Sequence, residues 1–315
     1  INILPNGPIG VTLFFVLSGY LISNILMEQQ TKAQFFRSFK NFVIRRALRI
    51  FPIYFLVLAG LLVLKRASIT INTDFYAHPW YYWTYLYNHW LEQHTNWADT
   101  LSPYWSLSVE EQFYVLWPFS ILLISSRFRA YFLWFCVLFG IAFRYYSVHL
   151  QQGIGVYMLT CVDTFAWGAL LAHYIREGRS AEIAVWIRRS IIPIIFCFLM
   201  ICLKHTDADL VKQLFFRTFT SLVSVAILFY AMQAGNFAKI LSISPLRLIG
   251  QMSYGIYLYH MLVPDLFFKI AGKLHIPIPE LPFNIVPFIV LFTFSFLSLH
   301  VIEKPIQSFK RFFVS

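Results

Sequence analysis

The segment YWSLSVEEQFYVLWP, Tyr104–Pro118, places two adjacent carboxylates, Glu110 and Glu111, at the start of an apolar run. An ionisable side chain at membrane depth is costly unless it faces protein or water, so such a residue is a candidate for function. Ser108 stands three residues before Glu111, the spacing of a capping box, which gives Glu111 a structural role at a helix start. Glu110 has no such role and is therefore the candidate catalytic residue of this segment.

The helical position of Glu110 supports this interpretation. On an α-helix, Glu110 shares a face with the aromatic residues three, four and seven positions further on, Phe113, Tyr114 and Trp117. The alternative is that both acids are only helix-start charges, which the positive end of the helix dipole favours.

The composition indicates the class of protein. The chain has 315 residues, of which 59% are hydrophobic and only 12% are charged, whereas a soluble domain carries about a quarter charged residues. The apolar residues form repeated runs of about 20, long enough to cross a bilayer. The net charge of +11 fits loop charges that follow the positive-inside rule, so we expect no nucleic-acid partner. We predict an all-α polytopic transmembrane helix bundle.

Neither the cysteines nor the histidines indicate a metal site. The three histidines of the longest polar stretch have no zinc-ligand spacing. The four cysteines lie in or beside apolar runs, suggest no disulfide framework and are interpreted as packing residues; they are Cys136, Cys161, Cys197 and Cys202.

The apolar runs predict about nine spans in a single membrane-embedded domain, residues 1–315. The longest stretch between spans, about 65–107, is an external loop crowded with aromatic residues. Such rings suit an interfacial belt, and they are also flat platforms on which a sugar ring could stack. The expected spans are 9–26, one ending near 64, 110–124, 131–146, 157–175, 190–203, 216–232, 253–271 and 283–302.

The loop charges predict the orientation of the bundle. When alternate loops are assigned to the cytoplasm, most of the Lys and Arg residues fall on one side, as the positive-inside rule requires. The C-terminus is then cytoplasmic and Ile1 external. An external start without a signal sequence leads us to expect at least one further span upstream of Ile1.

Three arginines lie together in NFVIRRALRIFP, Asn41–Pro52. Arg45 and Arg49 share one helix face, with Arg46 beside them, at the cytoplasmic entrance of a span. Guanidinium forks match phosphate and pyrophosphate oxygens, so the cluster is a candidate binding site for a soluble phosphorylated cofactor. The alternative is a set of topology charges that also contact lipid headgroups.

The segment GPIGVTLFFVLSGYLIS, Gly7–Ser23, sets small residues in a wall of Phe and Leu. Gly10, Ser18 and Gly19 are what close helix packing requires. Ser18 could instead line a cavity as a hydroxyl donor, or act as a nucleophile if a base lies beside it.

A candidate histidine lies in SYGIYLYH, Ser253–His260. Ser253, Tyr257 and His260 share a face, and His260 is expected about two turns inside its span. There it could perform acid–base chemistry near neutral pH, or simply bind a neighbouring helix.

Two further charge pairs are interpreted as structural. Arg144 and Asp163 lie near the external ends of consecutive spans and could pair with each other. His300 and Glu303 are three residues apart and could form a local ion pair at a helix end.

Taken together, these segments resemble the acyltransferase 3 family of integral-membrane acyltransferases, over essentially the whole chain. The resemblance implies a bundle of about ten helices that moves acyl groups, commonly acetyl from cytoplasmic acetyl-CoA, to sugars of envelope or exported polysaccharides. The matching motifs are GVTLFFVLSGYLI, RRALRIFP, YWSLSVEEQFYVLWP, SYGIYLYH and the EKP of Glu303–Pro305.

The resemblance also implies roles for single residues. Arg45, Arg46 and Arg49 match the arginine motif of the family, Ser18 its FFxxSG motif, and Glu110 the conserved acid position. Two departures are present. The first helix of the family, with a basic residue followed about ten residues later by a catalytic His, is absent from this sequence, which agrees with the upstream span expected from topology. Where relatives often read Arg-x-Asp, this chain has Cys161 before Asp163.

The function expected from these observations is that of a multi-pass inner-membrane O-acyltransferase. Acyl-CoA, with acetyl-CoA as the expected donor, would bind at the arginine cluster, and a hydroxyl of a carbohydrate or glycolipid would accept the acyl group. Glu110, His260 and Ser18 are the candidate catalytic residues, and no metal is expected. Besides membrane lipid, no protein partner is predicted. The alternative is a transporter or flippase for a glycan or lipid-linked substrate, in which the buried polar residues would line a path.

Overall fold

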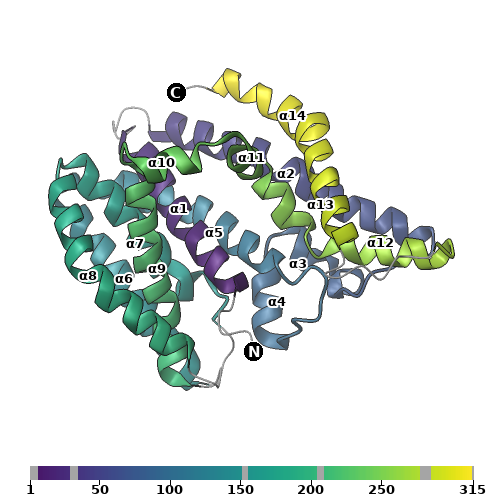
Figure 1. Cartoon of the computed structure of the whole chain (residues 1–315), viewed down its shortest axis with the longest axis horizontal. Coiled ribbons are helices and arrows are strands. Elements are labelled where there is room, and N and C mark those ends of the chain that lie inside the picture. Colours follow the sequence, from purple (N-terminus) through teal and green to yellow (C-terminus); the bar gives the residue numbers. More distant parts are fainter. Residues whose placement is uncertain (1–5, 29–34, 151–154, 204–208, 277–284, 314–315) are drawn as a thin grey trace. The chain divides into compact units, whose positions relative to one another are not determined.

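The structure, a computed structural model, describes residues 6–28, 35–150, 155–203, 209–276 and 285–313. These residues form helices and turns without a strand, which confirms the predicted all-α class (Figure 1). The helices before the centre of the chain are α1 (Asn6–Glu28), α2 (Phe35–Arg66), η2 (Asp74–Tyr76), α3 (Pro79–Trp83), α4 (Tyr87–His94), α5 (Tyr104–Leu123) and α6 (Ser126–His149). Those after it are α7 (Met158–Arg176), α8 (Ser180–Cys202), α9 (Leu210–Met232), α10 (Asn236–Leu241), α11 (Ser244–Tyr259), α12 (Leu262–Lys273), α13 (Ile285–Ser298), the π-helical turn η4 (Leu299–Glu303), α14 (Lys304–Ser308) and η5 (Phe309–Phe313).

Within the described residues, seven helical segments are long and apolar enough to cross a membrane. They are α1, α2, α6, α7, α8, α9 and the continuous segment Ile285–Phe313. Two of the nine expected spans differ from this set. The first, α5, begins at Tyr104 and its early turns are rich in polar residues. The second, expected over 253–271, is divided into α11 and α12, because the ring of Pro264 opposes the carbonyl of His260 four residues earlier.

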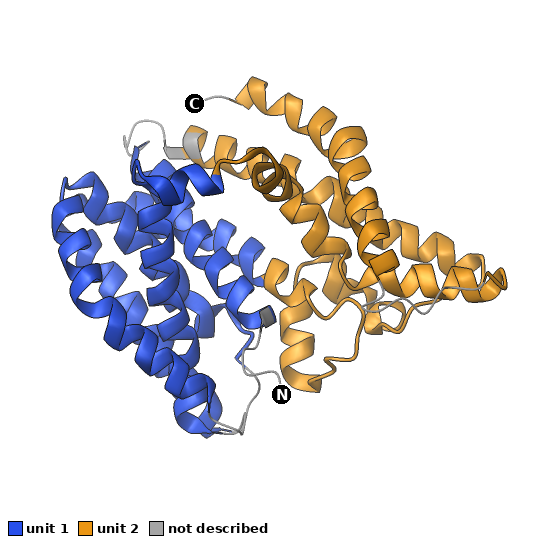
Figure 2. Cartoon of the chain, in the orientation of Figure 1, with its two compact units in different colours: residues 1–35, 109–241 blue, residues 36–108, 242–315 orange. Residues whose placement is uncertain are grey.

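The chain divides into two compact units, each built from two separate stretches of sequence (Figure 2). Unit 1 consists of Ile1–Phe35 and Val109–Leu241, and unit 2 of Phe36–Ser108 and Ser242–Ser315. The two units are described separately below, and the single domain expected from the sequence stays a prediction.

In unit 1, α7 is the central helix, and 72% of an 18-residue apolar segment of this helix is buried. It packs against α1, α6 and α9. Its contact with α1 is a contact of backbones: a Cβ added at Gly19 would lie 2.1 Å from the carbonyl oxygen of Phe165, and one added at Gly168 would lie 2.0 Å from that of Val16. The predicted close packing at Gly19 is therefore confirmed, whereas Gly10 has no neighbour within 4 Å of such an atom.

A hydrophobic cluster extends from this contact into α8 and α9. Its buried members are Val16 of α1, Leu171 of α7, Ile187 of α8, and Val225, Ala226 and Phe229 of α9. Each of the four helices contributes an apolar face, so burial of these faces stabilises unit 1 in the usual way, at about 25 cal/mol per Å².

In unit 2, the residues between α2 and α5 are folded rather than an open loop. Asp99 is fully buried, and its carboxylate accepts hydrogen bonds from the hydroxyls of Tyr82 (2.6 Å) and Tyr87 (3.2 Å) and from the backbone N–H of Leu101 (2.6 Å). Burial and the Asp99 charge raise the pKa of both tyrosines. Both hydroxyls therefore stay protonated and keep donating, which fixes η2, α3 and α4 in place.

A second carboxylate in the same segment, that of Asp74, binds the tip of α4 to η2. Its Oδ2 accepts from Trp90 Nε1 and Asn96 Nδ2, each at 3.0 Å. The remaining rings divide between the two expected roles: most are packed against one another, whereas Trp80, Trp83 and Trp97 are exposed. The segment is thus a packed aromatic subdomain with three exposed indoles.

The contact between α1 and α7 predicts the effect of adding one methyl group. Gly168→Ala inserts a Cβ into the backbone of α1, so we expect a loss of stability of at least the ~1–3 kcal/mol that overpacking costs. Gly10→Ala is the matched control, because its Cβ enters open space. Thermal unfolding of the purified variants in detergent checks this, and equal midpoints for the two variants would contradict the contact.

Candidate active site

The candidate catalytic acid lies in unit 1 at a contact between α1 and α5. Glu110 is 1% exposed, and its Oε1 accepts a hydrogen bond of 2.7 Å from Ser18 Oγ and another from the hydroxyl of Tyr114. The structure therefore brings together two residues that the sequence singled out separately, Ser18 and Glu110, and adds Tyr114. Tyr114 was noted as a neighbour on the same helix face, but its role as a donor was missed.

The capping box expected at Ser108 and Glu111 is wrong. The helix begins at Tyr104, so Ser108 is inside it, and the Ser108 hydroxyl donates to the backbone oxygen of Tyr104 at 3.2 Å. A serine within a helix commonly satisfies its hydroxyl in this way. Glu111 lies beside Glu110 on the helix but is only partly buried, so burial, not capping, distinguishes the two acids.

Aromatic rings surround the Ser18–Glu110 contact. Phe113 stacks on Phe165 with ring centroids 3.9 Å apart, and Phe165 stacks on Phe15 at 4.6 Å. Trp117 donates from its indole to Ser23 Oγ at 2.8 Å. These rings exclude water, and in such surroundings a hydrogen bond to a charged acceptor is stronger than in solution. The arrangement can hold a carboxylate and exchange a proton with a hydroxyl.

The arginine cluster lies on α2 in unit 2. Arg45 and Arg46 are half-buried and Arg49 is exposed, and Arg46 sits over the ring of Phe42, 5.6 Å from its centroid. Lys310, near the end of the described chain, lies within electrostatic range of all three arginines. Sequence alone did not connect Lys310 with these arginines, because more than 250 residues separate it from Arg49.

Glu303 is a buried acid beside this cluster. Its side chain is 4% exposed, and the charges of Arg49 and Lys310 act on it. Its Oε1 has no hydrogen-bond partner in the described part of the chain. The expected ion pair with His300 is wrong: His300 Nε2 contacts Lys304 Nζ at 2.9 Å. The reason is the π-helical turn Leu299–Glu303, whose wider winding changes which side chains share a face.

His260, the third catalytic candidate, is also in unit 2. It is exposed at the end of α11, with Nδ1 2.7 Å from the oxygen of Tyr257, and does not lie two turns inside a span as expected. Its position follows from the helix break before Pro264. Tyr257, expected on the same helix face as His260, has its hydroxyl 2.6 Å from Ser106 Oγ. A catalytic role for His260 stays a prediction.

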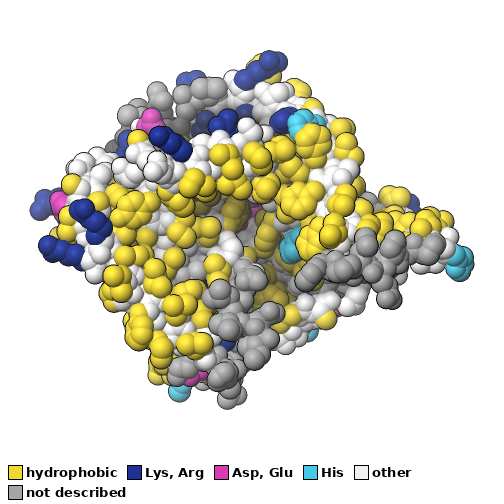
Figure 3. Space-filling view, viewed as in Figure 1, with side chains coloured by type: hydrophobic (Ala, Val, Ile, Leu, Met, Phe, Trp, Pro, Cys, Tyr) yellow, Lys and Arg dark blue, Asp and Glu magenta, His cyan; other side chains and the backbone are white. Residues whose placement is uncertain are grey.

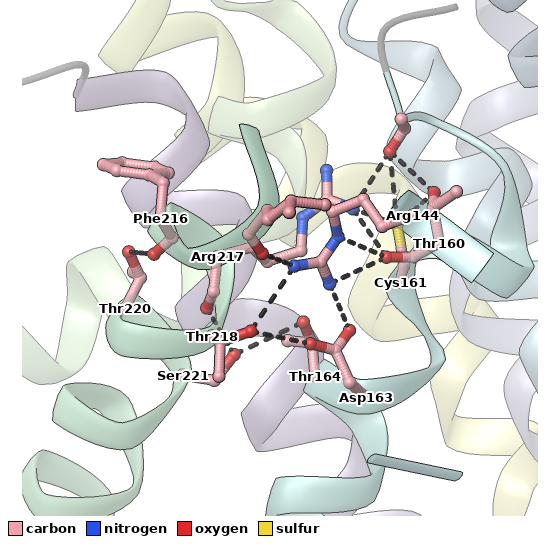
Figure 4. Close-up of polar contacts among 12 residues, drawn as sticks. Arg144, Thr160, Cys161, Asp163, Thr164, Phe216, Arg217, Thr218, Thr220 and Ser221 are labelled. Atoms are coloured by element: carbon pink, nitrogen blue, oxygen red, sulfur yellow. Dashed lines mark hydrogen bonds and ion pairs between the residues drawn. The ribbon is translucent and has the colours of Figure 1, made fainter. Parts of the chain in front are cut away.

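The expected pair of Arg144 and Asp163 is confirmed, and it belongs to a larger network in unit 1 (Figure 4). Arg144 Nη2 lies 2.6 Å from Asp163 Oδ1, and both side chains are fully buried. The same guanidinium donates to the backbone oxygen of Thr160, and Thr218 Oγ1 donates to Asp163 Oδ2 at 3.2 Å. The network joins α6, α7 and α9, and its charges are paired, so it is structural.

Cys161 lies at the edge of this network. It is buried, and Arg217 Nη1 of α9 approaches its sulfur to 3.0 Å while donating to the oxygens of Gly155 and Thr160 (Figure 4). Cys161 stands where relatives often have the arginine of the Arg-x-Asp motif. In this chain the guanidinium of Arg217, from α9, lies beside Cys161 instead. Among the described residues, no group of three or more His, Cys, Asp or Glu side chains is placed to hold a metal ion.

The helices and the buried carboxylate define a polytopic membrane protein with a candidate acid–base site. A family model described as an acyltransferase domain, that of the acyltransferase 3 family, matches residues 1–301. The chain therefore belongs to the acyltransferase 3 family, as the sequence motifs predicted, and at the level of the family it is an acyltransferase.

Curated relatives match almost the whole of this chain. "Peptidoglycan O-acetyltransferase OatA" of Listeria monocytogenes is 30% identical over 327 residues, covering 96% of this chain and 51% of the relative. "Putative peptidoglycan O-acetyltransferase YrhL" of Bacillus subtilis is 29% identical over 336 residues (97% and 52%), and "O-acetyltransferase OatA" of Staphylococcus aureus is 26% identical over 348 residues (98% and 54%). The chain spans about half the length of these relatives. No solved structure matches it.

The Arg144–Asp163 pair makes a prediction about stability. Asp163→Asn keeps the shape of the side chain but leaves the buried guanidinium without its counter-charge, so we expect a loss of about 3–5 kcal/mol. The exposed pair of Arg179 and Glu182, 2.6 Å apart, supplies the control: Glu182→Gln should change the stability far less, because water screens an exposed ion pair. Thermal unfolding in detergent compares the two, and a harmless Asp163→Asn would show that the pair does not hold unit 1 together.

Proposed function

We propose that the protein is a membrane O-acetyltransferase that transfers an acetyl group from acetyl-CoA to a hydroxyl of a cell-wall carbohydrate. The observation that carries this proposal is the buried Glu110 carboxylate held by the hydroxyls of Ser18 and Tyr114. Membership of the acyltransferase 3 family supports the reaction, and the names of the peptidoglycan O-acetyltransferase relatives support the acceptor.

Transfer to a hydroxyl requires a base and donors for the oxyanion. Glu110 serves as the base: it takes the proton of the acceptor hydroxyl as the new C–O bond forms. The C–S bond of the thioester then breaks, and the departing thiolate takes up the proton that Glu110 received, which restores the carboxylate. The hydroxyls of Ser18 and Tyr114 hold the carboxylate in position, and they are the proposed donors to the developing oxyanion. His260 is retained as a further catalytic candidate.

The donor is proposed to bind at the cluster of Arg45, Arg46 and Arg49, extended by Lys310. CoA carries three phosphate groups, and arginine forks bind phosphate oxygens in a bidentate way. Four cations from two parts of the sequence are within electrostatic range of one another. A charge needed only for topology has no reason to gather with others in space, so this convergence favours a binding site.

The proposed location is the plasma (inner) membrane, with the C-terminus in the cytoplasm. That orientation places the basic cluster on the side where acetyl-CoA is made, and it follows from the distribution of loop charges. The acceptor, a carbohydrate or glycolipid, would then approach from the external side of the membrane.

The role of Glu110 is tested with an isosteric pair of variants. Glu110→Gln removes the basic oxygen without changing bulk, so transfer of labelled acetyl should fall about 10²–10⁴-fold. Glu111→Gln, the control on the same helix, should keep most of the activity because Glu111 is only partly buried. Membrane expression and thermal unfolding of both variants are measured alongside. Full activity of Glu110→Gln would overturn the assignment, and a wild type that moves substrate without transferring acetyl would favour a transporter.

The donor site is tested by binding rather than by turnover. Arg49→Ala should weaken acetyl-CoA binding in detergent by about 10–100-fold, the loss expected for one charge-assisted hydrogen-bonded contact. Arg49→Lys should restore it only partly, because lysine lacks the fork. Arg66→Ala, at the other end of the same helix, is the control. If the triple alanine variant of Arg45, Arg46 and Arg49 binds acetyl-CoA as the wild type does, the cluster only orients the chain.

A further inference from the structure

Apart from His260, the proposed reaction gives no role to the segment SYGIYLYH, Ser253–His260. This segment forms the second half of α11 and contains three tyrosines. Each tyrosine hydroxyl is bonded to a different part of unit 2: that of Tyr254 to α2, that of Tyr257 to the start of α5, and that of Tyr259 to α13. The segment therefore joins three other helices through side-chain hydroxyls.

Tyr254 binds α2 beside the arginine cluster. Its buried hydroxyl donates to the backbone oxygen of Ile50 at 2.8 Å, and Ile50 directly follows Arg49. This contact falls in a weakened turn of α2, because Pro52 has no N–H to donate to the oxygen of Leu48 and its ring opposes that oxygen. A helix bends most readily at such a proline. The Tyr254 hydroxyl therefore fixes the turn that carries Arg49 against α11.

Tyr257 binds the first turn of α5. Its hydroxyl donates to the backbone oxygen of Pro103 at 2.9 Å and lies 2.6 Å from Ser106 Oγ. In the opposite direction, the hydroxyl of Tyr104 donates to the backbone oxygen of Leu258 at 3.2 Å. The three contacts together hold the start of α5 to the last turn of α11.

The proposed base lies one turn further along α5. Ser106 and Glu110 are four residues apart in this helix, so they lie on the same face. An α-helix is stiff over such a distance, because each backbone N–H donates to the carbonyl oxygen four residues earlier. A rotation or tilt of the first turn of α5 therefore also moves the carboxylate of Glu110.

The contacts of Tyr254 and Tyr257 lie at two different places in unit 2. Basic side chains gather near α14, whereas the side of α13 is hydrophobic (Figure 3). Lys310, which extends the arginine cluster, follows α14 in the chain. Tyr254 binds α2 beside that cluster, and Tyr257 binds α5 from a position one helical turn later in α11. The segment thus connects the proposed donor site with the helix that carries the proposed base.

We propose that Ser253–His260 is a positioning element for acetyl transfer, in which Tyr254 sets the position of the donor-binding arginines and Tyr257 sets that of Glu110. Both tyrosines act through the helix that their hydroxyls bind. The inference rests on the proposed function, and it assigns the two hydroxyls to different constants: Tyr254 to the affinity for acetyl-CoA, and Tyr257 to the rate of transfer. Tyr259, whose hydroxyl lies 3.0 Å from Ser298 Oγ of α13, affects neither.

Three substitutions on this one helix test the proposal in the purified full chain, because each removes a hydroxyl and keeps the ring. Tyr254→Phe should raise the Kd for acetyl-CoA about five-fold, the value of one net hydrogen bond, with the kcat of acetyl transfer unchanged. Tyr257→Phe should lower kcat about 10–100-fold, since a small displacement of a catalytic group can cost that much, with the Kd unchanged. Tyr259→Phe, the matched control, should change neither constant. Thermal unfolding of all three variants shows how much stability each hydroxyl contributes.

Two further measurements separate positioning from a general loss of structure. If Tyr257 acts through Glu110, Tyr257→Phe should have no further effect on kcat in a Glu110→Gln background. Amide hydrogen exchange gives a result that does not depend on activity. Exchange should rise at residues 104–108 in Tyr257→Phe and at residues 48–53 in Tyr254→Phe, and at neither segment in Tyr259→Phe.

A wild-type kcat in Tyr257→Phe, or a wild-type Kd for acetyl-CoA in Tyr254→Phe, would overturn the proposal. Equal losses of kcat in Tyr257→Phe and Tyr259→Phe would overturn it as well, because the hydroxyls would then serve only the stability of unit 2. A wild type that neither binds acetyl-CoA nor transfers acetyl would instead overturn the proposed function. In that case unchanged exchange at both segments would also rule out positioning by the two tyrosines.

Discussion

The close contact of α1 with α7 determines where the candidate site lies. Gly19 and Gly168 let the two backbones approach until no side chain fits between them, and the residue before Gly19 is Ser18. A larger residue at either glycine would push α1 away from α7. Hydrogen-bond distances vary over only a few tenths of an ångström, so such a shift would break a hydrogen bond made from α1. The 2.7 Å contact of Ser18 with Glu110 therefore depends on two glycines that make no polar contact themselves. The Phe15–Phe165–Phe113 stack depends on the same approach.

The class of protein and the position of the buried acid could be predicted from sequence, because both follow from periodicity. Bilayer thickness sets the length of the apolar runs, and helical spacing put Glu110 among aromatic residues. Its partnership with Ser18 could not be predicted, since 92 residues separate them and only the tertiary contact of α1 with α5 joins them. The sequence placed the start of α5 too late. The helix begins at Tyr104, directly after Pro103, a residue favoured at helix entrances. The backbone N–H of Leu101 donates to Asp99 in the turn before it, and these features outweigh the capping pattern at Ser108.

Three buried acids show how this chain accommodates charge at membrane depth. Asp163 faces a guanidinium and a hydroxyl, so its charge is paired within unit 1. Glu110 accepts from two hydroxyls, which stabilise a carboxylate but can also exchange protons with it. Glu303 lies near two cations, yet one of its oxygens has no hydrogen-bond partner in the described residues. The partner type thus distinguishes the paired structural acid, Asp163, from Glu110, the acid proposed as the base.

The neighbourhood of Glu303 bears on the arginine cluster as well. Arg45, Arg46 and Arg49 repel one another and Lys310, and such like-charge contacts are unfavourable unless an anion is present. Glu303, on the π-helical turn, lies within electrostatic range of Arg49 and Lys310. A chain that needed these cations only for orientation could spread them along α2 and avoid the repulsion. In the proposed function, the phosphates of acetyl-CoA are the anions that offset this repulsion, because arginine forks bind phosphate oxygens in a bidentate way.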